Sequence, residues 1–108
     1  MKEEWKEIDG FNGLYLISNY GRVKSPERII PHWRNPEVKR RIRMRYLKTV
    51  VKFNGRQFVR LFNGKTVEKH YTDDLVAKHF LPNPENKTEI EHIDGYAYNS
   101  SVTNLKWK

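Results

Sequence analysis

Four residues near the end of the sequence are of the types that hydrolytic sites use: Glu91, His92, Asp94 and Asn104. A histidine beside a carboxylate can stay neutral near pH 7 and accept a proton from water, while a glutamate offers oxygen to a hard divalent cation. The Asn104 carboxamide carries no charge, but it can join two backbone groups and so fix a loop. These residues indicate either a metal-dependent hydrolytic site or a polar hairpin turn, because all of them are also common on protein surfaces.

The last third of the sequence resembles the HNH endonucleases of phage and intron homing elements. The segments that carry the resemblance follow one another in the order Leu75–Phe80, Pro82–Lys87, Glu91–Gly95, Asn99 and Asn104–Trp107. Their order and spacing are far more specific than a lone pair of histidine and asparagine.

The resemblance implies a role for three residues. His92 takes the place of the general base that activates water, and Asn104, which is 104 − 92 = 12 residues later, takes the place of the asparagine that orients this base. Glu91 stands where the family usually has a metal-binding Asp, His or Asn. The implied cofactor is one divalent metal ion, with Mg²⁺ as the first expectation and Mn²⁺ as the alternative. Glutamate is one methylene longer than aspartate, which could displace the ion, and in-line attack tolerates little misplacement.

A third motif residue of the family, a His or Asn that completes the metal site, follows on a helix that would lie beyond Lys108. We therefore expect residues 49–108 to form an HNH-like domain without the last helix of the ββα-metal motif. Three interpretations stay open: a truncated form, a partner that supplies the last ligand, or a catalytically inactive remnant that binds DNA. One carboxylate alone would hold Mg²⁺ weakly.

Residues 1–26 resemble the nuclease-associated modular domain, or NUMOD, that often precedes such catalytic domains and is thought to help bind DNA. Short apolar runs alternate there with Asp9-Gly10 and Asn12-Gly13, which predicts short strands joined by tight turns. Trp5 and Tyr15 are expected to fill a small core. The DNA contacts are expected from exposed polar residues of this module, namely Asn19, Arg22 and Lys24.

Residues 27–48 are interpreted as a basic connector between the two modules. Prolines interrupt regular structure in its first half, and the second half carries Lys39, Arg40, Arg41, Arg43 and Arg45 with hardly any acids between them. Alternation over residues 41–47 predicts one strand with its arginines on one face. This face would suit a DNA backbone, although a charge run can also be a merely solvated surface.

The segment before the HNH-like motif predicts a meander followed by a helix. Strand-like runs at residues 49–53, 57–62 and 66–71 are separated by two Asn-Gly pairs, and Arg56 at the first of these turns is expected to project outward, where it could contact DNA. Thr72 is the expected N-cap of a helix over Asp73–Phe80. The family commonly has His-Arg where this sequence has Asp73-Asp74. The predicted fold class is α+β.

Composition limits the possible partners. A net charge of +8 and a pI near 9.8 predict a polyanionic partner, DNA, although some basic proteins bind nothing. The sequence has no cysteine and no apolar run long enough for a signal peptide or a membrane span. We expect a monomer in the cytoplasm of a bacterial or phage-infected cell. A protein that inhibits a host nuclease is a weaker hypothesis, because a DNA mimic would be acidic.

Overall fold

The computed structural model describes residues 2–108, and its N-terminal part is a four-stranded antiparallel sheet. The sheet order is β1 (Trp5–Glu7), β2 (Leu16–Ser18), β3 (Val23–Ser25) and β6 (Arg45–Tyr46). Gly10, Asn12 and Gly13 take positive φ angles in the loop between β1 and β2, as the two Gly-containing pairs in the sequence predicted. Because β6 comes from residues 45–46, the basic segment contributes a strand to this sheet.

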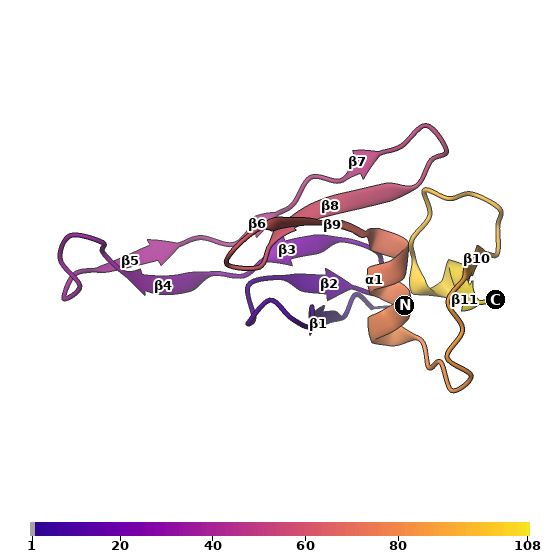
Figure 1. Cartoon of the computed structure of the whole chain (residues 1–108), viewed down its shortest axis with the longest axis horizontal. Coiled ribbons are helices and arrows are strands. Elements are labelled where there is room, and N and C mark those ends of the chain that lie inside the picture. Colours follow the sequence, from indigo (N-terminus) through magenta and orange to yellow (C-terminus); the bar gives the residue numbers. More distant parts are fainter. Residues whose placement is uncertain (1) are drawn as a thin grey trace.

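A long hairpin, called the arm below, extends away from the rest of the molecule (Figure 1). It consists of β4 (Arg28–Pro31) and β5 (Lys39–Ile42), which pair with each other and with no other strand of the described residues. The expectation of one strand over residues 41–47 is wrong, because β5 ends at Ile42 and the chain resumes as β6 in a different sheet. The molecule is elongated, with extents of 52 × 30 × 27 Å.

A second antiparallel sheet leads into the helix of the structure. Its order is β7 (Val50–Val51), β8 (Gln57–Phe62) and β9 (Val67–Tyr71), and α1 (Thr72–Phe80) follows β9 directly. The predicted meander and the position of the helix are confirmed. The predicted N-cap is wrong: Tyr71 occupies that position, and the buried Thr72 hydroxyl is 2.8 Å from the Ser100 hydroxyl.

The C-terminal part is a two-stranded hairpin. It contains β10 (Ile90–His92), a long loop, the short 3₁₀-helix η1 (Val102–Asn104) and β11 (Leu105–Trp107). Figure 1 shows this hairpin beside α1, on the side opposite to the arm. Short antiparallel sheets around one helix confirm the α+β fold class.

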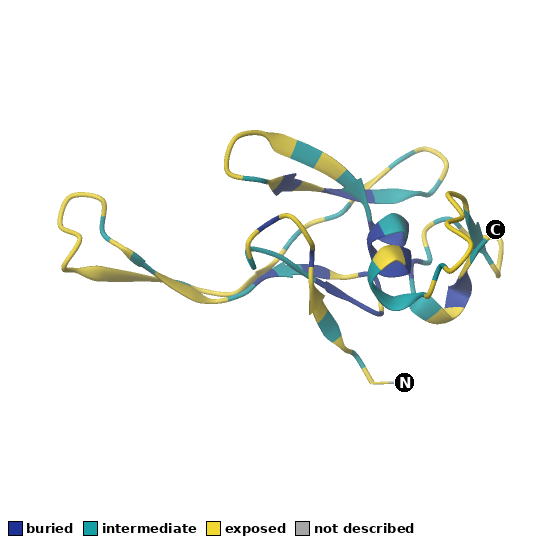
Figure 2. Ribbon diagram, turned by 60° about the horizontal axis from the view of Figure 1, so that its bottom comes forward, coloured by how far each residue is buried: buried dark blue, intermediate teal, exposed yellow. Residues whose placement is uncertain are grey.

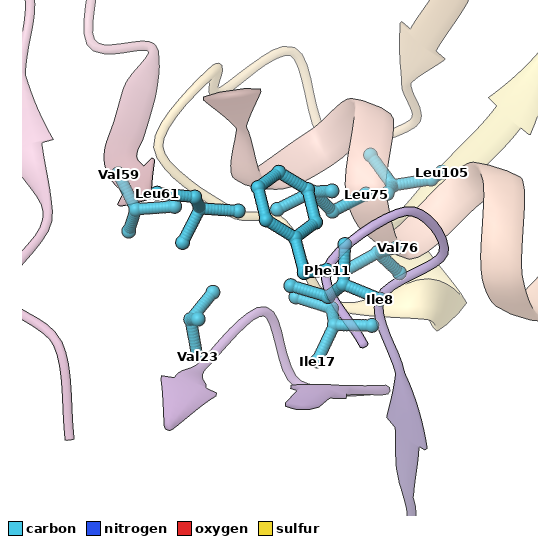
Figure 3. Packing of buried hydrophobic residues seen from close by; sticks show 9 residues of the cluster. All are labelled: Ile8, Phe11, Ile17, Val23, Val59, Leu61, Leu75, Val76 and Leu105. Carbon is cyan, nitrogen blue, oxygen red and sulfur yellow. The ribbon is translucent and has the colours of Figure 1, made fainter. Parts of the chain in front are cut away.

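The core forms where α1 meets the first two sheets and β11. Figure 3 shows the nine buried residues of the cluster, which are Ile8, Phe11, Ile17, Val23, Val59, Leu61, Leu75, Val76 and Leu105. Tyr15 packs against this cluster, and its hydroxyl accepts a hydrogen bond from the Phe62 N–H. Trp5 was also expected in the core, but it lies on the outer face of the first sheet, with the Lys24 Nζ 4.0 Å from its ring centroid.

Candidate active site

Glu91 and His92 lie on opposite faces of the C-terminal hairpin. In the antiparallel register, Glu91 is opposite Lys106 and His92 is opposite Leu105. Successive side chains of a strand point to opposite faces, so the Leu105 face turns toward the core and the Glu91 face turns away from it. The two residues that the sequence placed in one site therefore have different surroundings.

His92 faces the first turn of α1. Its Nε2 lies 3.3 Å from Oδ2 of Asp73, whose side chain is only 2% exposed. This nitrogen is buried and has no hydrogen bond of good geometry, so the Asp73 carboxylate is the charged group next to it. Hydrogen bonds at catalytic residues are often long or poorly aligned in the absence of substrate. The arrangement is that of an imidazole held against a buried carboxylate.

Arg56 fixes the orientation of that carboxylate. Its Nε donates to Asp73 Oδ2 at 2.9 Å and its Nη2 donates to Asp73 Oδ1 at 2.8 Å, which is a bidentate pair. Hydrogen bonding to Asp73 raises the pKa of Arg56. The expectation that Arg56 projects outward is wrong, because its guanidinium turns inward to Asp73 and lies 3.8 Å from the centroid of the Tyr71 ring. Its contact with DNA stays a prediction.

A hollow of about 500 Å³ opens beside these groups. Arg56, Asp73, Asp74 and His92 contribute to its lining, so water and a ligand can reach the group that surrounds the imidazole. Burial raises the pKa of Asp74, with the neighbouring Asp73 charge as the second cause. The hollow thus combines one histidine, three carboxylates and two cations, with Glu89 and Lys108 as the further charged residues of its lining.

Asn104 closes the loop that joins His92 to η1. Its Oδ1 accepts from the Asp94 N–H at 2.9 Å, and its Nδ2 donates to the Asn99 carbonyl at 3.0 Å and to Asp94 Oδ1 at 2.9 Å. The Tyr96 N–H is the main cause that lowers the pKa of Asp94, followed by the Asn99 side chain. Asn104 therefore fixes the backbone that leaves His92, and its role in orienting the base stays a prediction.

Glu91 is engaged by a lysine. Its Oε2 lies 2.9 Å from Lys106 Nζ, and this hydrogen bond lowers the pKa of Glu91. Within residues 2–108, no three His, Cys, Asp or Glu side chains gather as a metal site would require. A cation at Glu91 would displace Lys106 and would take its other ligands from water or from substrate oxygens, as Mg²⁺ commonly does.

Three of the proposed DNA contacts lie on or near the first sheet. Asn19 was expected to be exposed, but it is buried, and its side chain bonds the Glu4 N–H and the Lys2 carbonyl. The expectation of an exposed Asn19 is therefore wrong. Arg22 and Lys24 do reach the outer face, where they form a cationic-aromatic face together with Trp5 and Tyr46.

Arg22 is the most constrained member of this face. It pairs with Glu3, and its guanidinium lies 4.7 Å from the centroid of the Tyr46 ring. The hydrogen bond from Arg22 lowers the pKa of Glu3. One cation of the face is thus already neutralised, whereas Lys24 is held mainly by its contact with Trp5.

The remaining basic candidates lie on the arm and just after it. Lys39, Arg40 and Arg41 belong to β5, Arg43 lies between the strands, and Arg45 belongs to β6. All five are exposed. Arg41 pairs with Glu27 at 2.6 Å. Figure 2 shows that the arm is exposed along almost its entire length.

Asp73 is the site residue that the sequence reasoning missed. Asp73 stands in the first turn of the predicted helix, where an acid usually offsets the helix dipole. One signal was present: two acids stand where the resembling family commonly has His-Arg. Nothing in the local pattern, however, shows that the first of these acids is buried against His92.

The two sheets, the arm and the start of α1 define the class of this protein. Residues 3–73 match the NUMOD4 motif, and the chain belongs to the NUMOD4 family. The match begins in front of β1 and extends into the first turn of α1, so it includes the arm and the second sheet.

Two curated relatives and one solved structure agree with this assignment. The chain is 32% identical over 104 residues to DNA endonuclease I-HmuI of Bacillus phage SP01, covering 96% of this chain and 51% of the relative. It is 30% identical over 96 residues to the uncharacterized HNH endonuclease L245 of Acanthamoeba polyphaga mimivirus, covering 89% of this chain and 24% of that protein.

The solved structure, described as DNA binding and cleavage by the HNH homing endonuclease I-HmuI, superposes with a TM-score of 0.72 at 30% identity. It covers 97% of this chain and 52% of that chain. The resemblance to HNH homing endonucleases with a nuclease-associated module is therefore confirmed, and the chain spans about half the length of I-HmuI. In the part of the chain that the structure describes, no helix is long and apolar enough to cross a membrane.

Proposed function

We propose that this chain is part of an HNH-type endonuclease that hydrolyses DNA phosphodiester bonds, with His92 as the general base. The observation that carries the proposal is the position of His92, at the end of β10, against a buried carboxylate and at the edge of an open hollow. The similarity to two HNH endonucleases over most of this chain supports the same reaction class.

In the proposed reaction, the imidazole accepts a proton from a water molecule. The water oxygen attacks phosphorus, the bond from phosphorus to the leaving sugar oxygen breaks, and that oxygen takes a proton from solvent water. A base that is held in position contributes about 10²- to 10⁴-fold to such a step. Asn104 contributes by fixing the loop that follows His92 through its bonds to Asp94 and Asn99.

A divalent cation, Mg²⁺ or Mn²⁺, is part of the proposal, with Glu91 as its protein ligand. Glu91 supplies one carboxylate, and phosphate oxygens of the DNA would supply further ligands. When bound, the cation would offset negative charge at the phosphate. The Glu91 carboxylate is exposed enough to exchange Lys106 for a cation, since its side chain is 43% exposed.

DNA is the proposed partner, and two surfaces are proposed to bind its backbone. One is the arm with the residues after it, which carry Lys39, Arg40, Arg41, Arg43 and Arg45. The other is the cationic-aromatic face with Arg22 and Lys24. We propose that the protein acts as a monomer in the cytoplasm of a bacterial or phage-infected cell; the phage origin of one relative supports the setting.

The second candidate function is DNA binding without cleavage. One observation favours it: Glu91 is paired with Lys106 and lies on the face opposite to His92, so the two groups do not converge. In this case the arm and the cationic-aromatic face would bind DNA, and the His92 region would not cleave it.

Nicking of supercoiled plasmid separates the two candidates. The wild-type chain is incubated with Mg²⁺ or Mn²⁺ beside His92→Ala and His79→Ala, a control histidine whose ring bonds Leu75 and Asp9 instead of facing the hollow. We expect nicking by the wild type and by the control, and its loss in His92→Ala. DNA binding without any nicking by the wild type would favour the second candidate.

A further inference from the structure

We propose that Asp73 is a positioning residue for His92, and that it holds the ring with the proton on Nε2 so that Nδ1 is the nitrogen that takes a proton from water. This inference rests on the proposed function for the role of the base. It assigns a task to an acid on α1 that lies 92 − 73 = 19 residues before the histidine.

The first support is the geometry of the pair. Asp73 Oδ2 is 3.3 Å from His92 Nε2, and this nitrogen is buried without any other partner. A buried ring nitrogen in this position is stabilised by carrying a proton toward the carboxylate, because a bare lone pair there would face negative charge. In a neutral ring with its proton on Nε2, Nδ1 is the nitrogen that can accept a proton.

The second support is that the carboxylate itself cannot rotate freely. Arg56 holds both of its oxygens, and the Asp74 N–H donates to Oδ1 at 2.7 Å. Oδ1 thus has two donors, whereas Oδ2 has one donor and is the oxygen that lies 3.3 Å from His92 Nε2. A group that positions a base must itself be fixed, and this carboxylate is fixed by an arginine and by the start of a helix.

The third support is that Arg56 offsets the charge of the buried Asp73 carboxylate. Arg56 also approaches Asp74 Oδ2 at 3.3 Å, whereas the carboxylate beside His92 Nε2 is that of Asp73. The guanidinium balances the buried charge of Asp73, which would be costly without a partner. Arg56, Asp73 and His92 therefore form a chain from the β7–β8 turn through α1 to β10.

Nitrogen NMR of the imidazole tests the proposal without DNA, metal or turnover. Long-range ¹H–¹⁵N correlation spectra at neutral pH identify which ring nitrogen carries a proton, and the His92 signals are assigned by their loss in His92→Gln. We expect a proton on Nε2 that exchanges slowly with water, and an unprotonated Nδ1. The spectra are read at a pH at which the ring carries a single proton, and a proton on Nδ1 there would overturn the proposal.

Two substitutions at neighbouring positions provide the matched comparison. Asp73→Ala is expected to abolish the slowly exchanging Nε2 proton signal, whereas Asp74→Ala is expected to retain it, because the carboxylate 3.3 Å from His92 Nε2 belongs to Asp73. Persistence of the signal in a folded Asp73→Ala protein contradicts the proposal. If this variant does not fold, Asp73→Asn decides, since a neutral acceptor must move the Nε2 proton resonance upfield and an unchanged resonance refutes the role.

The plasmid assay distinguishes this inference from the proposed function. If the wild type nicks DNA, Asp73→Asn is expected to slow nicking by roughly 10- to 100-fold, as the loss of a supporting contact commonly does. If the wild type does not nick DNA, the endonuclease proposal fails while the NMR result still decides whether Asp73 holds His92. An equal nicking rate in Asp73→Asn and wild type contradicts the positioning role.

Discussion

The arm and the His92 region differ in what holds them. Within residues 2–108, the two strands of the arm pair only with each other, and Ile29 and Trp33 are 66% and 75% exposed. The His92 region is assembled from three distant segments that meet around α1. The arm depends on local pairing and carries charge, whereas the His92 region depends on burial and exact placement of a few polar groups. We expect substitutions to separate the two regions in stability, in binding and in titration.

The largest expected contrast is in stability. Leu75→Ala removes a buried side chain of α1, which should lower the free energy of unfolding by about 2–5 kcal/mol. Ile29→Ala on the arm should change it by less than about 0.5 kcal/mol, because the side chain is mostly exposed. Urea denaturation measures both. Equal losses would mean that the arm packs against the rest of the molecule.

A smaller loss is expected at the turn between β2 and β3. Gly21 has φ = +89°, and an added Cβ would lie 2.8 Å from the Ser100 Cβ. Gly21→Ala should therefore destabilise the protein by about 1–3 kcal/mol through crowding, with a further backbone cost. Gly64→Ala is the matched control, since its φ is +99° but no atom lies within 4 Å. Equal destabilisation in the two variants would mean that the positive φ angle, and not crowding against Ser100, causes the loss of stability.

The next contrast concerns DNA binding by the arm. Replacing Lys39 and Arg40 together by glutamine should weaken binding and reduce the steepness of its salt dependence by about 0.9 for each lost phosphate contact. Lys65→Gln, at a turn tip of the second sheet, is the comparison at a different basic site. Fluorescence anisotropy at several salt concentrations gives the slopes. If the slope of the salt dependence is unchanged in the arm variant, Lys39 and Arg40 do not contact phosphate, and DNA binds at another surface.

The smallest expected effect is a shift in the titration of Glu91. Lys106 lowers the pKa of this carboxylate, so the pair favours the folded state above the unfolded pKa, and this contribution is lost as the pH falls through the folded pKa. Lys106→Gln should raise the pKa of Glu91 toward its ordinary value of 4.5. Carboxyl-detected NMR measures it, with Lys108→Gln as the weaker neighbouring change. No shift in Lys106→Gln would mean that the pair does not form in solution.

Local patterns predicted much of the fold. The Asn-Gly pairs predicted the turns of the second sheet, and the strands at residues 57–62 and 67–71 lie where β-propensity and turn signals placed them. Alternation failed over residues 41–47, because pairing partners decide where a strand ends: β5 pairs with β4, whereas β6 pairs with β3. A local pattern carries no information about which distant strand will be the partner.

The same limit applies to single side chains. Asn19 and Arg56 were expected at the surface because their types are usually exposed, but one is buried beneath the N-terminus and the other is turned toward Asp73. Trp5 differs in the opposite direction. Its size predicted a place in the core, but it lies on the outer face of the first sheet, in contact with Lys24. Whether such a side chain is buried or exposed depends on which other segments of the chain pack against it.

The sequence by itself determined the family resemblance, the α+β class, the basic character and the candidate residues His92, Glu91 and Asn104, because order and spacing of residue types are properties of the chain. Only the tertiary structure decided which of these residues meet. It brought Asp73 and Arg56 to His92 and turned Glu91 to the opposite face. The physical reason is that contacts between distant segments follow from packing around α1, and packing depends on the whole chain at once.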